Sequence, residues 1–382
     1  MYAKTSYQEK KPASHGIDIK TPKNFFTSNK KNMAIPNQHQ VFRLPEGDIS
    51  SYKQLVARQE SLAEIDKHEV LVKIKAVALN YRDVAICNGS YPLGVKSSLV
   101  PCSDACGEVV QVGSQVKGLQ VGDRVISLFM QDLLYGDVKY GDSSLGGALD
   151  GVLREYIVFA ENNVVKIPKK STMTDSEAAS LVCAGTTAWN ALYGLRPLKP
   201  GQTVLAEGTG GVSIIALQIA KAAGAITIVT SSSDEKLEFV KNNYGVNYTI
   251  NYRKYPDWEK KVLEYTDGLG VDYIIENGGI GTIQKSVGSL AYGGIVSLIG
   301  FLATLPSDQY PNVVMLANKK SAVLRGILVG SRQMEEDLVR FFVANDIHVG
   351  VDKEFKFTDE GVLNAYEYLS SQKHIGKVCI TL

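Results

Sequence analysis

The sequence predicts an α/β protein of two domains, in which a doubly wound parallel sheet follows a mostly antiparallel β domain. Residues 203–329 alternate β-branched or apolar runs with amphipathic runs over short connections, which is typical of repeated β-α-β units. Residues 203–224 open this half as a short buried strand, a glycine turn and a helix. Residues 41–160 instead carry short β runs separated by turns. A chain of 382 residues, 45% of them hydrophobic, is long enough to bury a core in each domain.

The elements of the β-rich half follow from their residue types and from the turns between them. Gly122-Asp123 and Gly151 are turn residues that separate expected strands. Helical spacing begins near residue 171, where either Ser171 or Thr174 suits the N-cap of a helix with an acidic first turn. The predicted elements of this half are strands at 70–79, 107–112, 124–129 and 156–160, and a helical region at 171–195.

The second half continues the alternation up to residue 329, and the C-terminal elements then break it. The predicted strands are 203–207, 226–230, 248–252, 271–276, 294–301 and 322–329, with helices at 211–223, 234–243, 258–265 and 281–290. The C-terminal elements are helices at 334–343 and 358–369 and strands at 355–357 and 377–381. Because these last elements do not extend the α/β pattern, we expect them to return to the first domain.

A glycine turn follows the first strand of the second half and indicates an anion-binding site. Gly208 and Gly210 lack the Cβ atoms that would block the close approach of a pyrophosphate. The helix that begins at Gly211 presents free backbone N–H groups and the positive end of its dipole to that anion. A complete dinucleotide fingerprint has a third glycine where this chain has Ser213, a small residue and so a mild departure. The run therefore predicts a dinucleotide-binding fold.

Charge and composition exclude several classes of partner. The formal net charge is +1, which argues against nucleic acid or an anionic membrane surface as the main partner. No uninterrupted apolar run approaches the roughly 20 residues that span a bilayer. The five cysteines include no Cys-x-x-Cys pair and are odd in number, which is typical of reduced thiols rather than of a disulfide framework. We therefore expect a soluble cytoplasmic protein.

The N-terminal tail differs in composition from the rest of the chain. Residues 1–32 contain seven lysines against two acidic residues, with two prolines and almost no apolar periodicity. We expect residues 1–33 to form a disordered basic tail, with Met33 as an alternative start. Mitochondrial targeting is the less favoured alternative, because a presequence favours arginine and this tail has none.

Several motifs agree in order with those of one enzyme family. They are ALNYRD (78–83), NGSYP (88–92), SDACGE (103–108), VGDRV (121–125), Asp150-Gly151 before Glu155-Tyr156, CAGTTA (183–188) and the glycine turn. Over residues 42–382 the sequence resembles the medium-chain dehydrogenase/reductase superfamily. The strongest likeness is to zinc-independent quinone, enal and enoyl reductases, and to zinc-type alcohol dehydrogenase-like proteins that have lost the metal. The resemblance implies a GroES-like catalytic domain at 34–170, a Rossmann domain at 171–331 and a segment at 332–382 that returns to the catalytic domain.

In zinc-dependent members of this superfamily, a cysteine, a histidine and a second cysteine bind the catalytic metal. The resemblance places Asn80, Ser103 and Cys183 at those positions. One thiolate with an amide and a hydroxyl does not supply the nitrogen and sulfur ligands that tetrahedral zinc requires. The four-cysteine structural lobe is also missing from the sequence. We therefore expect no zinc, with Cys183 as a small buried hydrophobe and Asp104 helping to order the site.

Without a metal, a hydrogen-bond donor must stabilise the negative charge of the reaction. When hydride adds to the carbon β to a carbonyl, charge collects on the enolate oxygen. The resemblance to enoyl reductases makes Tyr91 the first candidate donor; the alternative is a tyrosine in a surface loop. Asn80 and Tyr81 are further candidates, as an amide and a hydroxyl beside the nicotinamide. Thr187 resembles the family's threonine near the carboxamide, and packing inside a helix is the alternative for Thr186 and Thr187.

The segment after the second strand of the dinucleotide-binding fold decides between NADPH and NADH. An NAD-specific site usually has an acidic residue there. We assign Asp234 instead to the start of the next helix, beside a capping box of Ser232 and Glu235. Lys236 and Tyr252 match positions that contact the 2′-phosphate in NADPH-dependent relatives, so we expect NADPH rather than NADH. The expected cofactor-binding residues are Gly208, Thr209, Gly210, Gly211, Val212, Ser231, Ser232, Lys236, Tyr252, Gly278, Phe301, Leu302, Gly330 and Ser331.

These features predict an NADPH-dependent, zinc-independent oxidoreductase that transfers hydride to an activated C=C bond or a quinone as its small-molecule substrate. Two alternatives stay open: a nucleotide-binding or sensing protein with little turnover, and a carbonyl reductase of the alcohol dehydrogenase type. Retention of Asn80, Tyr91 and Thr187 favours the enzyme. The apolar run at 322–329 resembles the strand through which family members pair, so we expect a homodimer. Loops such as 130–149 set the size of the substrate pocket.

Overall fold

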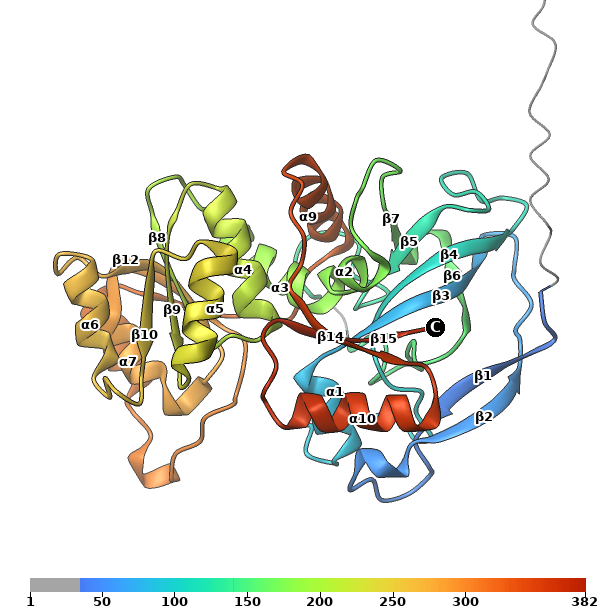
Figure 1. The fold of residues 1–382 in the computed structure, drawn as a ribbon, viewed down its shortest axis with the longest axis horizontal. Helices are drawn as coiled ribbons and strands as arrows, with labels where there is room; N and C mark the ends of the chain where they lie inside the picture. The colour runs from blue at the N-terminus through green and yellow to red at the C-terminus, as the bar shows by residue number, and fades with distance from the viewer. Residues whose placement is uncertain (1–34, 140) are drawn as a thin grey trace, which may run out of the picture. The chain divides into compact units, whose positions relative to one another are not determined.

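The computed structural model describes residues 35–139 and 141–382, so the predicted tail at 1–33 lies outside the described residues. Two large β-sheets organise residues 36–382, and helices pack around them (Figure 1). In the described part of the chain, none of the helices combines the length and the apolar character that crossing a bilayer requires.

The predicted doubly wound parallel sheet is confirmed, and its strands lie in the order β10-β9-β8-β11-β12-β13. Their bounds are β8 (Thr203–Glu207), β9 (Ile226–Ser231), β10 (Tyr248–Asn251), β11 (Val271–Glu276), β12 (Leu290–Leu298) and β13 (Val323–Gly326). The strand order reverses between β8 and β11. Ligands of such sheets bind beyond the carboxyl ends of the strands at this reversal, so the site is expected there.

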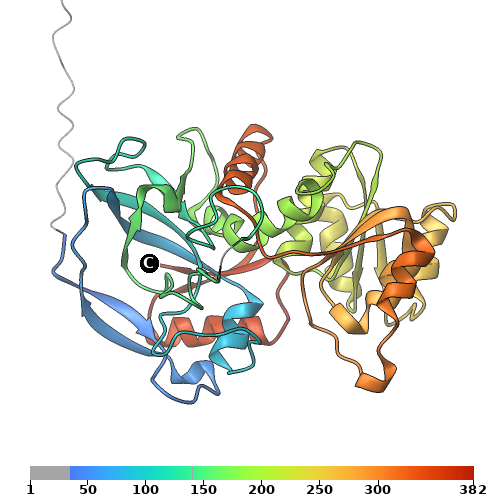
Figure 2. The ribbon, with the colours of Figure 1, turned by 180° about the vertical axis from the view of Figure 1, so that it is seen from behind.

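Successive side chains along each strand point to opposite faces of this sheet, and each face packs into a different hydrophobic core. Val204 and Ala206 of β8 pack with α3, α4 and α9 on one face, and Leu205 packs with α6 and α7 on the other. The helices of this half are α3 (Thr186–Tyr193), α4 (Gly211–Ala222), α5 (Asp234–Tyr244), α6 (Trp258–Tyr265), α7 (Ile283–Ser289), α8 (Val313–Lys320) and α9 (Arg332–Ala344). Figure 2 shows the molecule from behind, where the segment that contains α8 is coloured orange.

The second sheet is mostly antiparallel, in the order β14-β15-β3-β4-β5-β7, with β6 also pairing with β3. The bounds are β3 (Glu69–Leu79), β4 (Asp104–Val112), β5 (Arg124–Ser127), β6 (Tyr156–Ala160), β7 (Val164–Lys166), β14 (Val351–Lys356) and β15 (Lys377–Thr381). Helices α1 (Tyr81–Cys87) and α10 (Asp359–Ser370) pack against each other beside it. The last strand of the chain therefore lies next to β3, a strand of the first half (Figure 1).

Residues 174–194 connect the two sheets as a helix interrupted by a π turn. Thr174, rather than Ser171, caps α2 (Asp175–Ala179): its hydroxyl accepts from Glu177 N at 3.2 Å, and the Glu177 carboxylate accepts from Thr174 N at 2.6 Å. A π-helical turn over Leu181–Gly185 follows and leads into α3. Because a π turn displaces the usual i→i−4 bonds, backbone N–H groups within it become available to other partners.

Some elements differ from the sequence-based expectation. The antiparallel pair β1 (Gln38–Arg43) and β2 (Val56–Ser61), and the helices α1 and α8, were not predicted. The strand expected at 294–301 begins at Leu290, and α7 ends at Ser289 instead of reaching residue 290. The strand continues through Gly293, which adopts φ +73°, a conformation that glycine tolerates within a strand.

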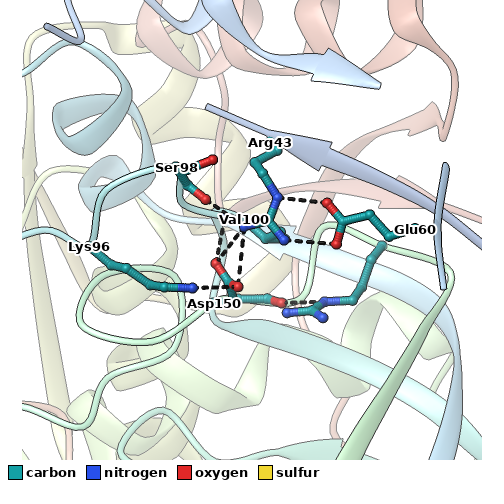
Figure 3. Close-up of polar contacts among 8 residues, drawn as sticks. Arg43, Glu60, Lys96, Ser98, Val100 and Asp150 are labelled. Carbon is teal, nitrogen blue, oxygen red and sulfur yellow. Dashed lines mark hydrogen bonds and ion pairs between the residues drawn. The ribbon is translucent and has the colours of Figure 1, made fainter. Parts of the chain in front are cut away.

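Asp150, from one of the sequence motifs, joins the loop before β6 to β1 (Figure 3). Its carboxylate accepts from Lys96 Nζ at 2.6 Å, from Val100 N at 2.9 Å and from Arg43 Nη1 at 3.1 Å. Arg43 Nε in turn donates to Glu60 Oε1 of β2 at 2.7 Å. Burial alone would raise the pKa of Asp150, but Lys96, the Val100 amide and Arg43 together lower it. The network therefore holds an ionised carboxylate.

Candidate active site

The glycine turn between β8 and α4 leaves open space where a pyrophosphate would lie. Gly208 adopts φ +75°, and Cβ atoms built on Gly208 and on Gly210 would meet no protein atom within 4 Å. Gly210 is the N-cap of α4 and supplies no side-chain cap, so the first amides of the helix face this space. A backbone cradle of this kind accepts phosphate oxygens without a charged side chain. The residues present therefore fit a dinucleotide.

Ser213 occupies the position of the third fingerprint glycine, and its hydroxyl both donates and accepts a hydrogen bond. Its hydroxyl donates to the Glu207 carbonyl oxygen at 2.7 Å and accepts from Asn277 Nδ2 at 2.9 Å. The same amide group of Asn277 donates to the Glu207 carbonyl at 3.1 Å. A side chain that small and that well bonded lets α4 pack on β8 without the glycine.

Two buried glutamates face each other at the strand reversal. Glu207 ends β8 and Glu276 ends β11, and the Ser286 hydroxyl lies between them, 2.7 Å from Glu207 Oε1 and in contact with Glu276 Oε2. Burial, followed by the negative charge of Glu276, raises the pKa of Glu207 well above its usual value. Glu207 therefore binds a proton more tightly than an ordinary glutamate, directly behind the glycine turn.

The carboxyl end of β9 is rich in hydroxyl groups and carries a neutralised acid. Ser233, not Ser232, is the N-cap of α5, and its hydroxyl accepts from Lys236 N at 3.3 Å; the Ser232 capping box expected from the sequence is therefore wrong. Asp234 lies in the first turn of the helix, as expected, and is exposed. Its carboxylate pairs with Lys254 Nζ at 2.7 Å and accepts from Asn251 Nδ2 at 2.9 Å.

The other residues expected near the 2′-phosphate lie around this strand end. Ser231 is buried and Tyr252 is exposed, and Tyr252 N donates to the Ser231 carbonyl. Lys236 Nζ donates to the carbonyl oxygens of Gln372 at 2.7 Å and His374 at 2.9 Å, so its ammonium ties α5 to the turn before β15.

Helix α1 holds one cluster of candidate catalytic groups. Arg82 Nε donates to the Tyr91 hydroxyl oxygen at 3.3 Å, and the guanidinium lies over the Phe129 ring at 4.7 Å. Its other nitrogens donate to Ser144 Oγ at 2.7 Å and to the Leu145 carbonyl at 2.9 Å. Arg82 thus ties Tyr91 to the loop at 130–149, which makes Tyr91 part of a built cluster.

The three positions that would carry zinc ligands surround a carboxylate instead. Asp104 is fully buried; its Oδ1 accepts from Ser103 Oγ at 2.6 Å and its Oδ2 accepts from Cys183 N, in the π turn, at 3.1 Å. Lys377 Nζ lies 3.6 Å from Asp104 Oδ2 and donates to Asn80 Oδ1 at 2.6 Å. Burial raises the pKa of the Cys183 thiol, which keeps it protonated.

This donor set does not fit zinc. Zinc needs a tetrahedral shell of nitrogen and sulfur ligands. Here the Asn80 amide oxygen accepts from an ammonium, the Ser103 hydroxyl donates to a carboxylate, and the Cys183 thiol is protonated, so these groups do not form such a shell. Among residues 35–139 and 141–382, no group of three or more His, Cys, Asp or Glu side chains is placed to hold a metal ion. Cys183 is half-buried at the edge of the core, whereas the other four cysteines are buried.

Tyr81, Phe301 and Leu302 form an exposed apolar group. The rings of Tyr81 and Phe301 meet edge to face with centroids 6.1 Å apart, although they come from α1 and from the loop after β12. Their side chains are 44% and 48% exposed, and Leu302 is 52% exposed. Exposed apolar side chains gathered from separate segments are typical of a ligand-binding rim.

The remaining candidates are mainly engaged in the fold. Ser331 caps α9, since its hydroxyl accepts from Met334 N at 3.4 Å, and a Cβ on Gly330 would lie 2.9 Å from the Thr186 methyl group. The Gly278 amide donates to both Glu276 and Glu207. Thr187 and Thr209 are buried and Val212 is half-buried.

Sequence reasoning gave no role to Arg82, Lys377, Glu207 or Glu276. Arg82 lay within a quoted motif, and its function depends on partners far along the chain. The other three share a signal that was available: each is a charged residue at the first or last position of a mainly apolar strand. Such residues are rarely buried unless they are paired or functional.

Comparison with known proteins agrees with this architecture. The family model for the alcohol dehydrogenase GroES-like domain matches residues 66–169, and the model for zinc-binding dehydrogenase matches residues 211–344. A zinc-type alcohol dehydrogenase-like protein of Schizosaccharomyces pombe is 43% identical over 343 residues, which are 88% of this chain and 97% of that protein. An acryloyl-coenzyme A reductase of Metallosphaera sedula is 29% identical over 82% of this chain and 92% of its own length.

A solved structure of a putative alcohol dehydrogenase from Sinorhizobium meliloti superposes with a TM-score of 0.82 at 36% identity, covering 91% of this chain and all of that one. Sequence and fold therefore agree over nearly the whole described chain. The chain belongs to the medium-chain dehydrogenase/reductase superfamily of NAD(P)-dependent oxidoreductases.

Proposed function

We propose that this protein is an NADPH-dependent, zinc-independent reductase that transfers hydride to an activated C=C bond or to a quinone. The observation that supports it best is the polar network of Asn80, Ser103, Asp104 and Lys377, which are hydrogen-bonded to one another or ion-paired around the positions where the resemblance expects zinc ligands. A reaction in this site needs hydrogen-bond donors for the developing negative charge. The likeness to an acryloyl-coenzyme A reductase, named for a substrate with such a C=C bond, agrees with this class.

The bound nicotinamide supplies the hydride, and the side chains of this chain handle charge and proton. Tyr91 is the proposed proton donor. Because its oxygen accepts from Arg82 Nε, its own hydrogen is free to point to a substrate. Asn80 is the proposed donor to the substrate's carbonyl oxygen, and Tyr81 with Phe301 forms the apolar rim. Thr187 remains a candidate contact of the carboxamide.

NADPH is the proposed cofactor, on the basis of charge at the end of β9. A free carboxylate at Asp234 would repel a 2′-phosphate, but here Lys254 and Asn251 occupy both of its oxygens. Tyr252 and Arg253, which follow Asn251 in the chain, are exposed, and Ser232 adds a hydroxyl. A carboxylate that is already ion-paired, with an arginine next in sequence to its lysine partner, favours the phosphorylated ribose.

The proposed assembly is a homodimer formed through β13. In the described residues this strand pairs with β12 on one side and lies at the edge of the sheet. The exposed side chains of Tyr310, Val314 and Met315 add apolar surface in the preceding segment. Light scattering would give twice the 41.5 kDa chain mass if this edge pairs with a second copy, and a single chain mass would contradict it.

The test of function is NADPH oxidation by the purified protein with a panel of short enals, cyclic enones and quinones. We expect saturable turnover with NADPH, weaker turnover with NADH, and a rate in Tyr91→Phe reduced by about 10²-fold or more. Elemental analysis is expected to find less than stoichiometric zinc. Saturable NADPH binding without turnover of any substrate, unchanged in Tyr91→Phe, would instead identify a nucleotide-binding or sensing protein.

A further inference from the structure

Lys377 is a buried ammonium at the point where the two sheets meet. Its side chain is 3% exposed, and a Cβ built on Gly211 would lie 2.6 Å from Lys377 Cδ, so the stem packs against the start of α4. The strand register explains the position of its head group. Since Val378 pairs with Leu79 in the antiparallel ladder, the preceding residue of β15, Lys377, lies opposite Asn80.

A buried ammonium must be paired, and Lys377 lies closer to the Asn80 amide than to the Asp104 carboxylate. Lys377 Nζ donates to Asn80 Oδ1 at 2.6 Å and lies 3.6 Å from the nearer Asp104 oxygen, beyond ordinary hydrogen-bond distance. Asp104 is already held by Ser103 Oγ and by the amide of Cys183. The short contact of the ammonium is therefore with the Asn80 amide.

That contact fixes which way the Asn80 amide faces. An ammonium has only donors, so the amide must turn its oxygen to Lys377 and its Nδ2 group away. In the described residues Asn80 Nδ2 is buried and has no hydrogen-bond partner. A buried donor left unpaired costs about 1–3 kcal/mol, so it is a group held ready for a ligand. The Lys377 charge also polarises the amide and strengthens its N–H as a donor.

We propose that Lys377 is a positioning residue that orients and polarises Asn80, so that Asn80 Nδ2 donates to the carbonyl oxygen of the substrate. The inference deepens the proposed function and rests on it. The ammonium thereby places positive charge near the developing oxyanion, and it acts there through the Asn80 amide. No new bond is formed by either residue.

The experiment is a double-mutant cycle on the full-length protein with 2-cyclohexen-1-one and saturating NADPH. Asn80→Ala removes the donor, and Lys377→Met keeps the stem on Gly211 while removing the charge. We expect each single change to lower kcat roughly 100-fold, and the double variant to lose no more than Asn80→Ala alone. Lys377→Arg should restore most of the rate, and Lys373→Met, an exposed lysine nearby, should leave it unchanged.

One further variant and a binding measurement separate a positioning role from a folding defect. Lys377→Met strands the buried Asp104 carboxylate, so Asp104→Asn/Lys377→Met provides a charge-neutral version for folding. The affinity for NADPH, measured by fluorescence, should stay within about threefold in these variants. Weaker NADPH binding with unchanged kcat at saturation, or additive losses in the cycle, would overturn the positioning role.

A second readout separates failure of this inference from failure of the proposed function. The side-chain amide resonance of Asn80 should shift when cyclohexanone is added to the NADP⁺ complex, and not in Lys377→Met. If no enone or quinone is turned over but this shift appears, the proposed reaction fails and the orienting role stands. If turnover occurs and the Asn80 resonance does not respond to cyclohexanone, the inference alone fails.

Discussion

The buried glutamate pair behind the glycine turn makes a prediction about pH and stability. The Ser286 hydroxyl has one hydrogen and lies between Glu207 and Glu276, so it donates to one carboxyl group and accepts from the other. Glu276 Oε1 accepts from Gly278 N and Gly279 N, both at 2.8 Å, whereas burial and the negative charge of Glu276 raise the pKa of Glu207. Glu207 therefore holds the proton. Glu207→Gln replaces the donating O–H by an N–H and keeps the acceptor for Gly278.

The expected magnitude follows from proton linkage. The pKa of Glu207 is raised in the folded protein, so above the ordinary glutamate pKa the unfolded chain releases a proton that the folded protein keeps. Stability is then fully present below the unfolded pKa and falls with rising pH, by about 1.4 kcal/mol per pH unit, until the folded pKa is reached. Glutamine has no such slope. Between pH 5 and pH 7 the stability difference between Glu207→Gln and wild type should widen in favour of the variant, by at most about 1.4 kcal/mol per pH unit.

The assay is urea unfolding at pH 5, 6 and 7, followed by the fluorescence of the buried Trp258. The matched control is Glu276→Gln, in which one of the two carboxylate acceptors becomes an N–H₂ group, facing either the Ser286 hydroxyl or the backbone donors; it should destabilise the protein at all three pH values. Identical pH slopes for wild type and Glu207→Gln would refute the proton on Glu207. If Glu276→Gln rather than Glu207→Gln stabilises the protein, the proton is on Glu276 and the assignment to Glu207 is wrong.

Two further predictions concern the cofactor cradle and the ion-pair network. Gly210→Ala places a methyl group in open space with no protein atom within 4 Å, so the melting temperature should stay within about 1 °C while NADPH affinity, measured by titration, falls at least tenfold. Asp150→Asn removes the charge that Lys96 and Arg43 share, and calorimetry should show a loss of about 1–3 kcal/mol at pH 7. Because the pKa of Asp150 is lowered, wild type should lose this contribution as pH falls below about 4, where the two proteins converge. Strong NADPH binding by Gly210→Ala, or a gap between Asp150→Asn and wild type that persists at pH 2, would contradict these expectations.

Local pattern was sufficient where an element is defined by its own residues. The bounds expected for β6, β11, α6 and β15 equal those of the structure, because each is a continuous run between clear turn residues. The open space at Gly208 and Gly210 likewise follows from two residues without Cβ atoms. The N-cap of the helix that follows β9 was harder to predict, because three consecutive serines can each serve as a cap. Ser233, not Ser232, is the N-cap.

The candidate site was only partly predictable, because its partners come from distant segments. Asn80 and Tyr91 were recognised as chemistry-bearing residues, but nothing near Asn80 in the sequence points to Lys377, 297 positions away. The bond from Cys183 N to Asp104 depends on a π turn, which has no sequence signature comparable to a helix cap. Long-range pairing of this kind is set by sheet register rather than by local propensity.

The start of β15 explains how this register assembles the site. Gly376 N donates to the Thr209 carbonyl at 2.9 Å, inside the glycine turn, and the following Lys377 reaches Asn80. One dipeptide thus contacts the pyrophosphate cradle of the parallel sheet and the amide donor of the antiparallel sheet. The backbone that bonds to the glycine turn is therefore continuous with the lysine that contacts Asn80. The two sheets thus meet through residues 376 and 377, which lie in none of the motifs recognised in the sequence.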